Sequence, residues 1–262
     1  MGKQIVLPGV SFPSTLPVLR VRPPATGLLF GIDPDALELP NGTLVDSIPD
    51  AAGIHPAATQ SVGTQRPTLV HNALGTTGKG LRFDGGDNLI LSGTALDLSR
   101  NKSRLSVYAL AQRDAGTTIA QDILAMTTGS GGARVALGGG ATNTQLRAGA
   151  RRLDADAQSA YATSTDASFA GQIVKLSAHY EWSAGRVVLH VKSPTVTRDV
   201  NVALAAGAGS TSDTRSNSGF IGGSVPSASW AGTILSLLVY DSLDDAQLTA
   251  AVHQFWQKRY GV

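Results

Sequence analysis

The sequence of 262 residues contains no cysteine and few charged residues, and both shortages narrow what the protein can do. Without cysteine the chain forms neither disulfide bonds nor thiolate metal sites, so zinc fingers and cysteine nucleophiles are excluded. Only 15% of the residues are charged, and the formal net charge at pH 7 is +2. This small excess of positive charge does not favour binding to nucleic acid or to a membrane surface.

Glutamate is also scarce, which argues against glycoside hydrolysis. Retaining glycosidases need two carboxyl groups about 5 Å apart, one as nucleophile and one as general acid. The two glutamates are Glu38 and Glu181, and Glu181 is followed by Trp182 and Ser183, so no second acid stands at i+2 or i+4 on its strand face. The five histidines are scattered, and no G-x-S-x-G motif is present. We therefore predict no catalytic residue, no bound metal and no cofactor.

Long hydrophobic runs are missing as well. No uninterrupted apolar run approaches the roughly 20 residues that a membrane-spanning helix needs. Near the N-terminus, Pro8, Pro13 and Pro17 interrupt the apolar stretch before it reaches signal-peptide length. We therefore expect no membrane insertion and no export signal.

Glycine and proline are abundant, at 30 and 12 residues, which is typical of many short strands joined by tight turns. Residues 105–112 and 174–182 alternate between apolar and polar side chains, which predicts two half-buried antiparallel strands. The second continues through a glycine-containing turn at 183–185 into 187–192 as a hairpin. Further strands are expected at 122–126, 133–137, 145–151 and 195–202, and the total fits a two-sheet jelly roll.

The C-terminal region contains the strongest local signals. Residues 233–240 are almost continuously β-branched, leucine or aromatic, which predicts a strand buried on both faces in the middle of a sheet. Ser242 and Asp245 have the spacing of a capping box, so we predict a helix that begins near Leu243. Gly261 supplies the left-handed residue that commonly ends a helix.

Several of these segments together resemble a known family. The pieces are LRFDG-x-D-x-L at 81–89, W-x-G-x-I at 230–234 after a glycine pair, and then Val-Tyr-Asp, Leu-Asp-Asp and Lys-Arg-Tyr-Gly. They resemble the laminin-G-like, concanavalin A-like lectin and glucanase jelly rolls, although Phe30 stands where that family usually has tryptophan. The resemblance implies an all-β, two-sheet antiparallel jelly-roll sandwich at 26–262, with one C-terminal helix.

Residues 1–25 form a separate segment, predicted to be an extended, proline-rich arm. Proline prevents both regular helix and interior strand, so an apolar segment of this kind should lie along a surface. That surface belongs either to its own domain, as an edge strand, or to another subunit, as an assembly arm. The residues assigned to assembly contacts are Val10, Phe12, Leu16, Val18, Leu19 and Val21.

Two groups of side chains are candidates for ligand binding. Arg147 and Arg151 share one face of a predicted strand, where they are either simply solvated or form a site for an anionic glycan. Trp230 lies in a polar, glycine-flanked stretch, where an aromatic ring could stack on a sugar, although the resembling family uses that position for packing. Tyr161 and Trp182 are weaker candidates, and the alternation places Trp182 in the core.

Calcium is a further alternative that the sequence leaves open. Asp84, Asp87 and Asn88 provide closely spaced oxygen atoms beside two glycines. The same residue types are ordinary turn formers, and their spacing is not that of an EF-hand loop. We therefore do not assign a metal site to them.

The resemblance implies a non-catalytic adhesion or recognition module. A module with an anchoring arm and no export signal suits a bacteriophage particle, because virions leave the cell by lysis. We therefore expect a virion protein made in the host cytoplasm, as a head decoration, fibre or tail accessory protein. Its expected partners are other virion structural proteins, further copies of itself, and host-surface glycans.

Two alternatives belong to other classes. A free carbohydrate-binding lectin predicts a ligand-lined face and a monomer or dimer. A glycoside hydrolase would need a carboxylate pair assembled from distant aspartates. The arm distinguishes the virion protein from the free lectin. Deleting the arm should abolish assembly of a virion protein but leave sugar binding by a lectin unchanged.

Overall fold

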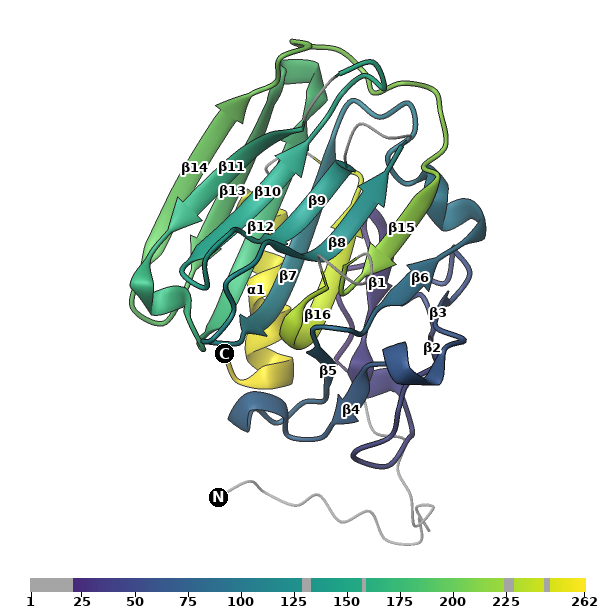
Figure 1. Cartoon of the computed structure of the whole chain (residues 1–262), viewed down its shortest axis with the longest axis vertical. Coiled ribbons are helices and arrows are strands. Elements are labelled where there is room, and N and C mark those ends of the chain that lie inside the picture. The colour runs from purple at the N-terminus through teal and green to yellow at the C-terminus, as the bar shows by residue number, and fades with distance from the viewer. Residues whose placement is uncertain (1–20, 129–132, 157–158, 224–228, 243–245) are drawn as a thin grey trace, which may run out of the picture.

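The computed structural model describes residues 21–128, 133–156, 159–223, 229–242 and 246–262. These residues form two antiparallel sheets stacked face to face and one helix at the C-terminal end (Figure 1). The predicted all-β, two-sheet sandwich with a C-terminal helix is thereby confirmed. That helix falls short of the length and apolarity that crossing a membrane requires.

The first sheet, sheet A, has β16 near its middle. One edge of β16 pairs with β7, and the other edge pairs first with β5 and then with β1. In spatial order the strands of sheet A are β14 (Thr197–Ala203), β13 (Arg186–Lys192), β12 (Ile173–Glu181), β7 (Leu105–Arg113), β16 (Ala231–Tyr240), β5 (Gly80–Asp84) and β4 (Thr68–Val70), with β1 (Leu28–Ile32) also on β16.

The second sheet, sheet B, faces the viewer in Figure 1 and lies across sheet A. In spatial order its strands are β11 (Ala160–Thr165), β10 (Gln145–Ala150), β9 (Ala133–Gly139), β8 (Gln121–Thr127), β15 (Ser218–Ile221), β6 (Leu89–Leu91), β3 (Ala58–Thr59) and β2 (Ser47–Ile48). The sequence did not predict β11 and β15, because small residues dominate β11 and glycines flank the short apolar part of β15.

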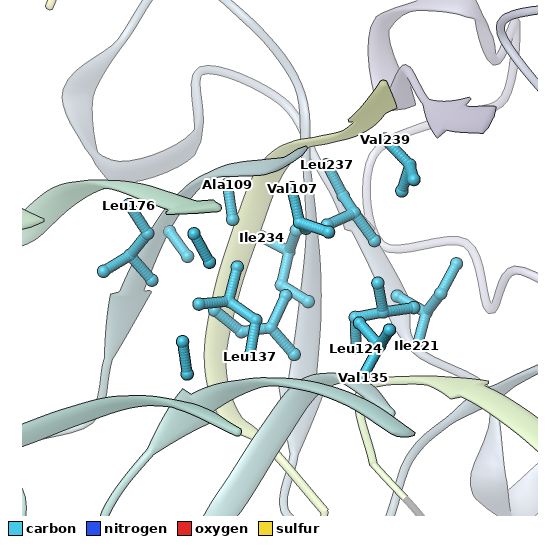
Figure 2. Close-up of a cluster of buried hydrophobic side chains, with 14 of the residues drawn as sticks. Val107, Ala109, Leu124, Val135, Leu137, Leu176, Ile221, Ile234, Leu237 and Val239 are labelled. Carbon is cyan, nitrogen blue, oxygen red and sulfur yellow. The ribbon is translucent and has the colours of Figure 1, made fainter. Parts of the chain in front are cut away.

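The main core lies between the two sheets and is built from the alternate side chains of each strand (Figure 2). Each fully buried leucine, valine or isoleucine contributes on the order of 1.5–3 kcal/mol relative to an exposed one. The side chains labelled in Figure 2 are Val107, Ala109, Leu176, Ile234, Leu237 and Val239 from sheet A, and Leu124, Val135, Leu137 and Ile221 from sheet B.

The outer face of sheet A is also buried, which corrects the prediction that β7 and β12 are half-buried strands. Tyr108 of β7 and His179 of β12 point away from the main core, yet both are fully buried. The cause is helix α1 (Ala246–Tyr260), whose Val252 and Trp256 pack in a second apolar cluster with Tyr108. Trp256 is therefore a core residue.

A buried ion cluster joins the last turn of α1 to the segment that directly follows β1. Arg259 donates from Nη2 to Asp33 Oδ2 at 2.8 Å and lies with Nε 2.7 Å from Asp35 Oδ2. The Arg259 side chain is only 9% exposed. Tyr260 adds a hydrogen bond from its hydroxyl to the carbonyl of Leu235 at 2.7 Å. The neighbouring Gly78 must lack a side chain, because a Cβ there would lie 2.4 Å from the Tyr260 ring.

The beginning of the described chain lies on this helix-covered side. Val21 packs against the second apolar cluster, and the Tyr240 hydroxyl donates to the carbonyl of Pro24 at 3.0 Å. Of the residues assigned to assembly contacts, only Val21 is described. Val10, Phe12, Leu16, Val18 and Leu19 lie outside the described residues, so the division into arm and domain stays a prediction.

Replacing Arg259 by methionine should destabilise the fold, because two nearly buried carboxylates would lose their cation. We expect Arg259→Met to lower the free energy of unfolding by about 3 kcal/mol. Urea denaturation followed by circular dichroism measures this change. The control is Lys258→Met, one residue away and exposed, which should change stability by less than about 0.5 kcal/mol. Equal effects of the two substitutions would contradict a stabilising role for the ion cluster.

Candidate functional site

The outer face of sheet B carries a row of polar and aromatic side chains across four neighbouring strands. The row runs from Tyr161 on β11 through Arg147 on β10 to Asp122 on β8, and Gly138 of β9 lies between the last two. The strand register creates the row, because Arg147 is paired with Gly138 on one side and Thr163 on the other.

Arg147 is held by two different contacts. Its Nη2 atom donates to Asp122 Oδ1 at 3.2 Å, and its Cζ atom lies 4.6 Å from the centre of the Tyr161 ring. The second contact is a cation–π interaction, which orients the guanidinium over the aromatic face. Within the described part of the chain, the buried Nε atom of Arg147 has no hydrogen-bond partner. The Arg147 side chain as a whole is 19% exposed, so part of it reaches the surface.

Asp122, the ion-pair partner of Arg147, is a buried residue with 8% of its surface exposed. Burial raises the pKa of its carboxyl group, while the charge of Arg147 and the hydrogen bond from it act in the opposite direction. The same carboxylate, after burial, raises the pKa of the fully buried Tyr180 hydroxyl, which donates to the carbonyl of Ala136. The charge of Asp122 thus acts both on Arg147 in the outer row and on Tyr180 in the interior of the sandwich.

Tyr161 is the exposed aromatic side chain of the site, with 38% of its surface accessible. Its ring lies flat over Gly149, the residue it pairs with on β10. A Cβ atom at Gly149 would lie 2.3 Å from Cε1 of Tyr161, so only glycine permits this position of the ring. Gly149 and the guanidinium of Arg147 hold the ring in place, and 38% of the Tyr161 side chain stays exposed.

This arrangement suits recognition of a flat, hydroxyl-bearing molecule. An exposed aromatic ring offers an apolar surface with little conformational freedom to lose, and the adjacent arginine offers N–H donors in a fixed plane. Tyr161 was only a weak candidate in the sequence, and Asp122 was missed. The sequence carries no signal for Asp122, because only the strand register places it across Gly138 from Arg147.

Two of the predicted ligand-binding residues lie elsewhere. Trp230 is 0% exposed and packs in the main core, so its ring cannot stack on a surface ligand in this structure. Arg151 shares the face of Arg147 as predicted, but it is 1% exposed instead of solvated. Its Nη2 donates to both the carbonyl and the hydroxyl of Thr128.

Two further arginines near Arg147 and Arg151, namely Arg134 and Arg152, also bind loops of the protein itself. Arg134 is fully buried and binds Asp154 and Thr214, and Arg152 donates to the carbonyl of Ala206. Of the predicted ligand-binding set, only Arg147 lies in the row. Arg134, Arg151 and Arg152 therefore hold loops in place, whereas Arg147 binds Asp122 and Tyr161.

The aspartates of the calcium alternative form a tight turn. Asp87 Oδ2 accepts the backbone N–H of Asp84 at 3.0 Å, and Asp84 Oδ1 accepts that of Gly86 at 2.7 Å. Burial, and then the charge of Asp84, raise the pKa of Asp87 to about 6. Among the described residues no three acidic or histidine side chains are grouped as a metal site would require.

Glu181, considered for catalysis, accepts a hydrogen bond from Arg186 at 2.5 Å.

Comparison with known proteins adds support for the fold. No family model matches this chain, and no curated protein matches it in sequence. In structure it is similar to Trypanosoma rangeli sialidase in complex with sialic acid, with a TM-score of 0.55 and 13% identity over 90% of this chain and 33% of the sialidase. It is also similar to the binding domain of botulinum neurotoxin serotype D, with a TM-score of 0.55 and 7% identity over 87% of this chain and 51% of that domain.

These similarities concern the fold, which is a two-sheet jelly-roll β-sandwich. The chain spans about a third of the length of the sialidase, so its likeness covers one part of that enzyme. At such low identity the likeness concerns the fold, and the choice of ligand has to rest on the residues of this chain.

Removing the Arg147 cation should make stability depend on pH in a defined direction. Arg147→Met leaves the buried Asp122 carboxylate without its partner and raises its pKa further above 3.8. A raised folded-state pKa contributes stability at low pH that is lost as pH rises through it. We expect a loss of about 2 kcal/mol at pH 7 that shrinks towards pH 4, measured by urea denaturation at both values.

The matched control is the double variant Asp122→Asn/Arg147→Met, which removes both charges. It should recover most of the stability at pH 7 and abolish the difference between the two pH values. A loss of the same size at pH 4 and pH 7 in Arg147→Met would show that the ion pair is not the cause.

Proposed function

We propose that this protein is a carbohydrate-binding module whose ligand surface is the outer face of sheet B, centred on Tyr161 and Arg147. The observation that carries the proposal is the exposed ring of Tyr161 against the partly exposed guanidinium of Arg147. A sugar ring presents an apolar C–H face and hydroxyl groups at its edge. The first would stack on Tyr161, and the second would accept hydrogen bonds from Arg147.

The charge balance of the site favours a particular mode of binding. Asp122 compensates the charge of Arg147 at 3.2 Å, so the row has little net charge to offer an acidic sugar. We therefore propose recognition through stacking and neutral hydroxyl groups. Binding of this kind should change little with salt concentration. Sialic acid, the ligand of the similar sialidase structure, belongs in the screen as the acidic comparison.

Substitution of Tyr161 tests the proposal. A glycan array identifies a ligand for the unmodified chain, and calorimetry then compares variants with that ligand. Tyr161→Ala should weaken binding at least tenfold, about 1.4 kcal/mol, whereas Tyr161→Phe should retain most of the affinity because the ring remains. Ile54→Ala, at an exposed site elsewhere, is the control.

A second substitution moves the ring without removing it. Gly149→Ala places a Cβ atom where the Tyr161 ring lies, so the ring must shift. We expect a loss of affinity close to that of Tyr161→Ala while the protein stays folded by circular dichroism. Unchanged binding in both variants, or no glycan bound by the unmodified chain, would overturn the proposed site.

The proline-rich arm supports a second, finer proposal, namely that the module is carried on a bacteriophage particle. The described end of the arm, Val21 to Pro24, contacts the helix-covered side of sheet A. An arm leaving from that side would leave the outer face of sheet B directed away from the anchor. Light scattering on the full chain and on a chain starting at Thr26 tests the arm. Assembly that is lost on truncation supports an anchoring role, and two identical monomers contradict it.

A further inference from the structure

A groove runs along helix α1 on the side of sheet A opposite to the proposed glycan surface. It has a volume of about 400 Å³ and lies between α1 and the outer faces of β12, β13 and β14. A second hollow of about 340 Å³ shares Lys175 and Lys192 with it and extends towards Val262. The two lysines therefore stand where the hollows meet.

The walls of this groove are predominantly apolar. The helix residues Ala246 and Ala250 line the first hollow, and Ile173 and Pro194 line the second. The methyl groups of threonines and the aliphatic stems of the lysines add further carbon surface. An apolar body of modest size fits such a surface.

Three basic groups converge on these apolar walls. Lys175 and Lys192 are directly paired across β12 and β13, so their side chains leave the same face of the sheet. His253 reaches the groove from α1, where its ring stacks on Trp256 with 5.5 Å between ring centres. Burial, followed by the charges of Lys175 and Lys192, lowers the pKa of His253 to about 4. Burial and Lys192 also lower the pKa of Lys175.

No described residue compensates the two lysines. The ion pairs among the described residues include neither Lys175 nor Lys192. The acidic residue lining the groove, Asp199, accepts a hydrogen bond from His190 Nδ1 at 2.7 Å. The Nε2 atom of His253 is buried, and within the described residues it has no hydrogen-bond partner. The groove thus holds two lysines outside any described ion pair and one carboxylate, that of Asp199, which is bound to His190.

We propose that this groove binds a small amphipathic anion, with its carboxylate, sulfonate or phosphate between Lys175 and Lys192 and its apolar body along α1. Charge complementarity decides the occupant. The protein's own residues 1–20 are apolar enough to fill a groove, but they contain no aspartate or glutamate and would leave the lysines uncompensated. This site is independent of the proposed glycan surface, because it lies on the other sheet.

Fluorescence titration with 8-anilinonaphthalene-1-sulfonate tests the proposal on the full chain, since this probe joins an anionic group to an apolar body. The double variant Lys175→Met/Lys192→Met keeps the aliphatic stems and removes both charges. We expect it to weaken probe binding at least tenfold. Lys258→Met, which removes an exposed charge from the same helix, should leave binding unchanged.

Competition experiments identify the part of the ligand that is recognised. Dodecanoate should displace the probe, and dodecanol, which lacks the charge, should not. Vesicles of phosphatidylglycerol distinguish a membrane lipid headgroup from a soluble anion, and we expect no cosedimentation with them. His253 provides a second readout, because a bound anion offsets the lysine charges and should raise its pKa in an NMR titration.

Three results would overturn the proposal. The first is equal probe binding by the unmodified chain and by Lys175→Met/Lys192→Met. The second is displacement by dodecanol as readily as by dodecanoate, and the third is binding to vesicles without displacement of the probe by dodecanoate. Circular dichroism of the double variant excludes loss of the fold as the reason for a lost signal.

Discussion

Strand β16 is buried on both faces, and this constraint organises the rest of the structure. Its residues Ile234, Leu237 and Val239 face sheet B, while Leu235 and Leu238 face α1. A strand that is apolar on both sides needs a cover on both sides. Sheet B supplies one cover and α1 the other. The outer face of sheet A is thereby occupied, and the outer face of sheet B keeps its exposed polar and aromatic row.

Buried arginines fix the periphery of this sandwich. Arg113 is almost fully buried and donates to the carbonyls of Thr142, Gln145, Ile119 and Gly140, so one side chain holds two loops at the edge of sheet B. Arg134 and Arg151 hold other loops in the same manner. A guanidinium suits this role because it carries five donors in one plane. Most arginines between residues 113 and 151 therefore stabilise loops of the protein itself.

The sequence predicted the sandwich well because alternation and caps are local signals. The strands at 105–112, 174–182 and 233–240 appear as β7, β12 and β16, and the predicted hairpin turns at Gly185, whose φ is 66°. Helix α1 is also confirmed, although residues 243–245 around its predicted start lie outside the described residues. These predictions needed only the spacing of apolar side chains and the chemistry of turns.

The candidate site was predicted less well, because alternation gives the direction of a side chain but not what covers it. Arg147 and Arg151 point the same way, yet Arg151 is buried and donates to Thr128, the residue directly after β8. Trp230 lies among polar and glycine residues in sequence, and tertiary packing buries it completely. Asp122 and Tyr161 meet Arg147 through the order of four strands, which the sequence does not contain.

The two proposed binding surfaces differ in how their charge is balanced, and this difference determines what each can recognise. On sheet B, the Asp122 carboxylate neutralises Arg147, so the available interactions are stacking and short-range hydrogen bonds. On sheet A, Lys175 and Lys192 repel each other beside apolar walls, so an anion would relieve an existing cost. Salt screens exposed charges over about 10 Å but affects stacking little. Raising the ionic strength should therefore weaken ligand binding on sheet A and leave ligand binding on sheet B nearly unchanged.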